Sequence, residues 1–321
     1  MKRCLLSIVL ILILFAAGCS NTAQTDYFPP PGELYDIGGY KLHLQCSGSG
    51  SPAVIMIAGS GDFSLTWALV APEIARTQRV CTYDRAGLGW SEASPYPRLA
   101  TTEVAELHAL LQKAGIAPPY ILVGHSLGGV LARLFTYTYS SEVIGLVLVD
   151  PGHEEQKTRQ EIAVQQSMDA AVSSSLKRLS DFATKAASGS LTEAEISALI
   201  NSNLPVKEQA EYSFVLRNKS IFWETVISET TSMDAGFAGV KDKQITSLGN
   251  IPLVVISSSA TLELATTPEL SVKADKVMRE LQREIAGQSS RGTHITAEGT
   301  THFIQLVKPQ VVIDAIKQVL P

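Results

Sequence analysis

Short apolar runs alternate with amphipathic segments along most of the chain. Continuous apolar or β-favouring runs predict buried strands at residues 53–59, 79–84, 120–124, 143–150, 251–258 and 293–299. Helical spacing predicts helices at residues 65–76, 101–116, 126–139 and 309–320. Residues 35–46 predict a hairpin that turns at Gly38 and Gly39. This alternation predicts an α/β fold with a mostly parallel sheet covered on both faces.

One stretch of about 100 residues, 151–250, breaks the alternation. It contains no convincing strand and is rich in Ala, Glu, Gln, Lys and Ser, which favours helices. Thr192 and Glu195 form a predicted capping box, with Leu191 and Ile196 placed as its hydrophobic staple. A helical stretch of this length between two strands indicates an inserted lid. The predicted core is therefore 33–150 and 251–321, with the lid between its sixth and seventh strands.

The N-terminus has the features of an export signal. Lys2 and Arg3 precede an apolar run at residues 5–17, which is too short to span a bilayer comfortably. The sequence "AAGC" then resembles a bacterial lipoprotein signal, which implies removal of residues 1–18 and lipidation of Cys19. An ordinary signal peptide cut near the same place is the alternative. Residues 19–32, stiffened by three prolines, are interpreted as a tether.

Composition narrows the class of protein further. The 321 residues are 45% apolar and 18% charged, with a formal net charge of −5. This is a globular composition without the basic surface that nucleic-acid binding requires. We find no metal-ligand motif and no phosphate-binding loop, so we expect no cofactor. We expect a small-molecule substrate, membrane contact only through the lipid, and no obligate protein partner.

The segment "ILVGHSLGGV", residues 121–130, contains the pattern Gly-x-Ser-x-Gly around Ser126. By itself this pattern is weak. Here it lies between a predicted buried strand and a predicted helix, and such a sharp turn would lift the serine side chain above the sheet edge. The helix N-terminus also favours negative charge that develops nearby. Ser126 is therefore a candidate nucleophile.

Together with "YDRAGLGWS" at residues 83–91, this segment resembles the α/β-hydrolase superfamily, specifically its lid-bearing serine hydrolase branch. The resemblance covers nearly all of residues 32–321 except the lid. It implies an eight-stranded sheet and a catalytic triad. His302, after the last predicted strand, is the implied base. Many members carry the acid after the next-to-last strand, but no aspartate stands there; the implied acid is Asp150, one strand earlier, with Glu263 as the alternative.

The resemblance also implies an oxyanion hole made of backbone N–H groups. One belongs to Leu127 and the other to Ser60, in a loop where Ala58 replaces the usual histidine. Asp84 and Arg85 are expected to hold the "DRAGLGWS" loop beside the pocket. The family's strand order would place Cys46 and Cys81 on adjacent antiparallel strands. We expect a disulfide between them; two buried thiols are the alternative.

The predicted reaction is hydrolysis of a carboxylic ester through an acyl-enzyme on Ser126. Serine at this position argues against the dehalogenase and epoxide hydrolase chemistry of the same branch. One alternative is cleavage of an amide, a peptide or a carbon–carbon bond by the same triad. Another is a non-catalytic, surface-tethered binding protein on a hydrolase scaffold. The lid would define the substrate, and its aromatic residues are Tyr212, Phe214, Phe222, Trp223 and Phe237.

Overall fold

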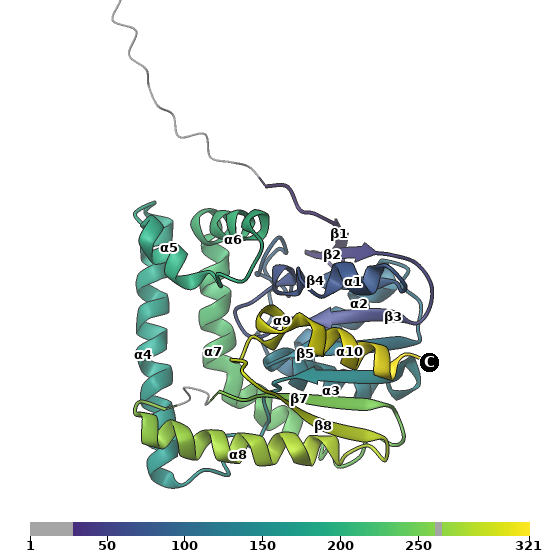
Figure 1. Cartoon of the computed structure of the whole chain (residues 1–321). Coiled ribbons are helices and arrows are strands. Elements are labelled where there is room, and N and C mark those ends of the chain that lie inside the picture. Colours follow the sequence, from purple (N-terminus) through teal and green to yellow (C-terminus); the bar gives the residue numbers. More distant parts are fainter. Residues whose placement is uncertain (1–27, 261–264) are drawn as a thin grey trace, which may run out of the picture.

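The structure, a computed structural model, describes residues 28–260 and 265–321. A single eight-stranded sheet lies at its centre, in the order β1-β2-β4-β3-β5-β6-β7-β8 (Figure 1). Its strands are β1 Glu33–Asp36, β2 Lys41–Ser47, β3 Ala53–Ile57, β4 Val80–Tyr83, β5 Tyr120–His125, β6 Val143–Val149, β7 Leu253–Ser258 and β8 Gly292–Ala297. Only the pairs β1–β2 and β2–β4 are antiparallel. The predicted fold class is confirmed.

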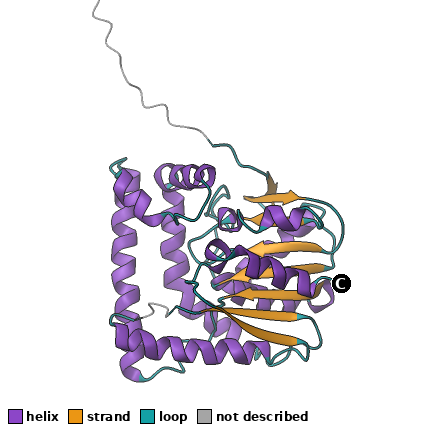
Figure 2. Cartoon of the chain, in the orientation of Figure 1, coloured by secondary structure: helices purple, strands orange, loops and turns teal. Residues whose placement is uncertain are grey.

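Helices cover both faces of this sheet (Figure 2). One face packs against α2 Ala100–Lys113, α3 Leu127–Thr138 and α8 Pro268–Ala286. The other packs against the 3₁₀ turn η1 Ser64–Trp67, α1 Ala71–Ala75, α9 Ile304–Val307 and α10 Pro309–Val319. A second 3₁₀ turn, η2 Ser140–Glu142, joins α3 to β6.

The central strands are apolar because they are buried on both faces. Every residue of β3 and β5 is buried, including His125 at the end of β5. Parallel strands end at the same edge of a sheet, and ligands of open α/β sheets bind outside that edge. The loops after β3, β5, β6 and β8 therefore converge there, and they carry most of the predicted site residues.

Four helices lie between β6 and β7, on the left of Figure 1. They are α4 Ile162–Ala187, α5 Glu193–Leu199, α6 Val206–Asn218 and α7 Ser220–Lys241. The predicted capping box is present at the start of α5, and Leu191 and Ile196 are buried in one cluster. Phe63 and Leu88 of the core belong to the same cluster as Trp223 of α7, so apolar packing joins the insertion to the core. Within the described ranges, no helix is both long and apolar enough to cross a membrane.

Two local predictions differ from the structure. The single helix expected at 65–76 is divided into η1 and α1. Pro72 lies in the first turn of α1, where its missing N–H costs nothing, but within a longer helix its ring would clash with the preceding turn. The helix α8 was not predicted, although Ala274, Met278, Leu281 and Ile285 are buried at helical spacing.

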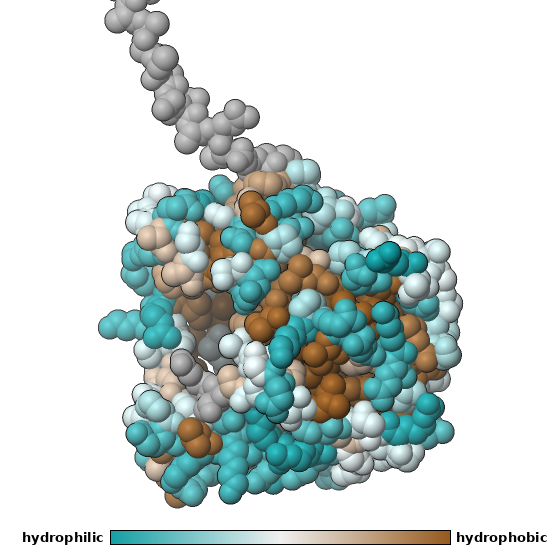
Figure 3. Space-filling model, viewed as in Figure 1, coloured by the Kyte–Doolittle hydropathy of each residue, from teal (hydrophilic) through white to brown (hydrophobic). Residues whose placement is uncertain are grey.

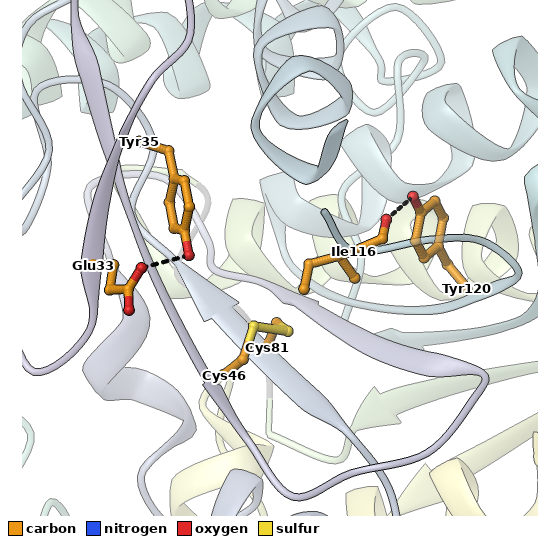
Figure 4. The surroundings of a disulfide bond; sticks show 6 residues. All are labelled: Glu33, Tyr35, Cys46, Cys81, Ile116 and Tyr120. Carbon is orange, nitrogen blue, oxygen red and sulfur yellow. Dashed lines mark hydrogen bonds between the residues drawn. A yellow bond between two sulfur atoms is a disulfide. The ribbon is translucent and has the colours of Figure 1, made fainter. Parts of the chain in front are cut away.

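A disulfide joins Cys46 of β2 to Cys81 of β4 (Figure 4). The two residues are direct partners in the antiparallel register, and their Cα atoms are 4.1 Å apart. The edge hairpin β1–β2 is thereby covalently attached to the sheet. Beside the disulfide, the hydroxyl of Tyr35 donates to Glu33 at 2.7 Å and that of Tyr120 to the carbonyl of Ile116 at 2.7 Å.

Candidate active site

Ser126 occupies a sharp turn between β5 and α3. Its backbone angles are φ 52° and ψ −117°, a region that residues with a side chain rarely adopt. Glycine is required on either side: a Cβ on Gly124 would lie 2.2 Å from the carbonyl oxygen of Gly128, and one on Gly128 equally close to that of Ile57. The Gly-x-Ser-x-Gly pattern therefore reflects close backbone packing around a strained serine.

Asp150 and His302 come together at the same edge of the sheet. Asp150 directly follows β6 with φ 43° and is fully buried, whereas His302 lies in the loop after β8. The His302 Nδ1 is 2.8 Å from the Asp150 Oδ2, so the carboxylate can hold the imidazole in one orientation and tautomer. This hydrogen bond connects two residues that lie 152 positions apart in the sequence.

The Asp150 carboxylate accepts several further hydrogen bonds. The Ser258 N–H donates to Oδ1 at 3.1 Å and the Ser258 hydroxyl to Oδ2 at 2.9 Å. Arg279 and Gln282 of α8 donate to Oδ1 at 2.8 and 3.1 Å. Burial alone would raise the pKa of Asp150, but His302, Arg279 and the Ser258 N–H outweigh it and hold this pKa below its usual value. The group is therefore a carboxylate at neutral pH.

His125, the variable residue of the serine turn, supports the His302 loop. It is buried, and its Nε2 lies 3.0 Å from the backbone carbonyl of His302. Burial lowers the pKa of His125 to about 3, so the ring is neutral and donates this hydrogen bond. Its ring centroid lies 4.6 Å from that of His302. In the described part of the chain no hydrogen bond joins Ser126 to His302; such bonds often tighten only when substrate binds.

The loop after β3, called the oxyanion loop below, carries Ser60, the residue predicted to supply one oxyanion donor. Arg85 donates to the carbonyls of Ala58 and Gly59, both at 2.6 Å. Because the carbonyl and the N–H of one trans peptide unit point in opposite directions, the N–H of Ser60 faces away from Arg85. Within the described residues, neither this N–H nor that of Leu127 donates to the protein. Two backbone donors are therefore free beside the serine turn.

A residue of the insertion completes this loop. Glu229 of α7 accepts hydrogen bonds from the Gly61 N–H at 2.8 Å and from the Ser60 hydroxyl at 3.1 Å, and pairs with Arg85 at 2.7 Å. Burial would raise the pKa of Glu229, but Arg85 and the Gly61 N–H lower it overall. Arg85 thus holds the loop after β3, whereas within the segment "DRAGLGWS" it is Asp84 that accepts a hydrogen bond, from the Trp90 N–H at 2.9 Å. Glu229 was not predicted, because nothing in the sequence links it to a loop 169 residues away.

A cavity of about 230 Å³ adjoins the site. Ser60 and Gly61 of the oxyanion loop line one side, and Phe303, which follows His302, lines another. The insertion contributes mostly apolar residues, which are Ala198, Leu199, Ile200, Asn201, Leu204 and Tyr212. Figure 3 shows a hollow in the surface between the insertion and the core. Of the other predicted aromatic residues, Phe222 and Trp223 are buried in the cluster that joins the insertion to the core, and Phe237 is buried in the core cluster beside α2 and α3.

Two predicted site residues, the alternative acid Glu263 and the lipidation site Cys19, lie outside the described residues. The described chain begins at Phe28, whose ring lies 5.7 Å from that of Phe214 on α6. Its carbonyl accepts a hydrogen bond from the Trp90 indole at 3.1 Å. Within the described residues, no group of three or more His, Cys, Asp or Glu side chains is arranged to hold a metal ion.

Residues 54–315 match the model of the alpha/beta hydrolase family. The chain therefore belongs to this family. It is 38% identical over 120 residues to the uncharacterised protein YqjL of Bacillus subtilis. The aligned region covers 37% of this chain and 47% of YqjL, so the chain spans about half the length of that relative. An AB hydrolase superfamily protein of Gibberella zeae is 26% identical over 292 residues, and the alignment covers 84% of this chain and 86% of that protein.

Two solved structures have a similar fold. The epoxide hydrolase CorEH has a TM-score of 0.62 at 19% identity, covering 89% of this chain and 97% of that one. The enol-lactonase from Burkholderia xenovorans has a TM-score of 0.59 at 17% identity, and the match covers 89% of this chain and 100% of the enol-lactonase chain. At these identities the likeness concerns the fold alone, and the reaction has to be argued from the site.

Proposed function

We propose that the protein is a serine hydrolase that cleaves a carboxylic ester through an acyl-enzyme on Ser126. The observation that carries the proposal is the convergence of three features at one sheet edge. These are a strained serine at a helix N-terminus, a histidine held by a buried carboxylate at 2.8 Å, and two free backbone donors. Serine, rather than aspartate, as the nucleophile favours acyl transfer over the epoxide chemistry of a neighbour in fold.

Each residue has a defined role in this mechanism. His302 takes the proton of the Ser126 hydroxyl as the oxygen attacks the acyl carbonyl. The N–H groups of Leu127 and Ser60 stabilise the oxyanion that develops. Asp150 stabilises the imidazolium without taking its proton. The imidazolium then protonates the leaving alcohol, and water activated by His302 releases the acid.

The insertion α4–α7 serves as a lid in this proposal. Its residues make up much of the cavity beside the oxyanion loop, and the mostly apolar lining suits a compact apolar acyl or alcohol group. The same catalytic residues could cleave an amide or a carbon–carbon bond. We favour the ester because it needs the least help for its leaving group, which protonation by His302 alone can supply.

The test is covalent labelling of the full chain, purified in detergent, with a fluorophosphonate probe. We expect the label on Ser126, located by mass spectrometry of peptides. Ser126→Ala should remove it, whereas Ser173→Ala, on the surface helix α4, should leave it unchanged. A folded wild-type protein that takes no label, or takes it elsewhere, would favour the binding-protein alternative.

We also propose export and lipid attachment at Cys19. The charged N-terminus, the apolar run and "AAGC" support this proposal, and the Cys46–Cys81 disulfide fits an oxidising compartment. Growth with a labelled fatty acid should mark the wild type and Cys4→Ala but not Cys19→Ala. Label that persists in Cys19→Ala would refute lipidation at this residue.

A further inference from the structure

An arginine is paired directly with the carboxylate that holds His302. Arg279 of α8 is 13% exposed, and its Nη1 lies 2.8 Å from Oδ1 of fully buried Asp150. Its Nη2 donates to the Ser258 hydroxyl at 3.1 Å and to the Ala260 carbonyl at 2.9 Å, and pairs with Asp275 at 2.8 Å. Arg279 therefore joins α8, the end of β7 and the carboxylate of the site.

This pairing has an electrostatic consequence for His302. A lone buried carboxylate would favour the imidazolium form, which cannot act as a base. The guanidinium bonds Oδ1 of Asp150 while the imidazole bonds Oδ2, so it offsets part of that negative charge. A positive charge close to a histidine favours its neutral form.

The ionisable groups that the described contacts connect to His302 come from β5, the end of β6 and α8. Asp150 faces it from the end of β6, and His125 from β5 is neutral as a result of burial. From α8 come Arg279 and, paired with it, Asp275. Asp150, Asp275 and Arg279 are therefore the charged groups of this network.

We propose that Arg279 is a positioning residue that fixes Asp150 and, through its charge, keeps His302 neutral and reactive at lower pH. The inference rests on the proposed function of Ser126, His302 and Asp150. Arg279 thereby influences the pH dependence of the reaction without a hydrogen bond to Ser126 or His302.

The experiment measures the rate of fluorophosphonate labelling of the full chain against pH, which needs no knowledge of the natural substrate. Arg279→Met should move the midpoint of the acid limb upward by about one pH unit. Arg279→Lys keeps the charge and should remain near the wild-type midpoint. Arg283→Met, one turn further along α8, is the matched control and should not move it.

A second variant tests the same charge effect if Arg279→Met does not fold. Asp275→Asn removes a negative charge and leaves Arg279 on Asp150, so its midpoint should move downward. Thermal unfolding of each variant reports whether it is folded. If folded variants label more slowly at every pH but keep the wild-type midpoint, Arg279 has a structural role only and the proposal is wrong. A wild type that takes no label would instead refute the proposed function.

Discussion

At the scale of single residues, the site depends on backbone strain at two positions. Ser126 and Asp150 both have positive φ although neither is glycine. Such conformations cost on the order of 1–3 kcal/mol each and persist only where the surroundings impose them. Here the Ser126 N–H bonds to the carbonyl of Val149, and the Asp150 N–H to that of Ile256, so the neighbouring strands hold both residues.

This strain leads to a prediction for position 126. Ser126→Gly and Ser126→Ala both remove the hydroxyl, and both should abolish labelling. Because glycine tolerates the observed φ and ψ, we expect Ser126→Gly to be more stable than Ser126→Ala by about 1 kcal/mol. Denaturant unfolding of the two variants measures the difference. The opposite order, with alanine more stable, would mean that the turn is relaxed.

At the scale of elements, the oxyanion loop is supported by a helix of the insertion. Glu229 of α7 accepts from the loop at Gly61 and Ser60 and pairs with Arg85, which holds the carbonyls of Ala58 and Gly59. The direction of the Ser60 N–H therefore depends on how α7 packs. Movement of this helix would alter the proposed oxyanion hole as well as the cavity.

We therefore expect Glu229→Gln to slow acylation. An amide has a single acceptor oxygen and no charge, so it cannot serve Gly61, Ser60 and Arg85 together. Loss of one oxyanion donor costs about 10²–10³-fold, and a misdirected donor should cost about 10–100-fold in kcat, with a smaller change in KM. The control is Glu224→Gln, an exposed residue of the same helix. Equal effects of the two variants, or a change in KM alone, would contradict this dependence.

At the scale of the whole molecule, pattern and spacing predicted the elements that have strong local signals. The buried strands, the start of α3 and the helical insertion each follow from a run of residues close in sequence. The structure also places Asp150 beside His302 and Cys46 beside Cys81, the pairs that family resemblance suggested. These pairs depend on strand order, which residue spacing alone does not specify.

The parts that could not be predicted are long-range polar contacts. Arg279 reaches Asp150 across 129 residues because α8 packs beside β7, the neighbour of β6 in the sheet. The apolar spacing of α8 could have revealed the helix, yet the role of its arginine follows only from the sheet order. Polar side chains carry no periodicity that indicates their partners, so such contacts emerge only from the assembled fold.

Trapping the acyl-enzyme tests the proposed role of Ser126 most directly. The full chain would be mixed with a short p-nitrophenyl ester, quenched in acid within the first turnovers, and digested for mass spectrometry. We predict an acyl group on Ser126, absent in Ser126→Ala and greatly reduced in Asp150→Asn, together with a burst of p-nitrophenol. Ester hydrolysis without an adduct on Ser126, or one unaffected by Asp150→Asn, would contradict the assignment of these residues.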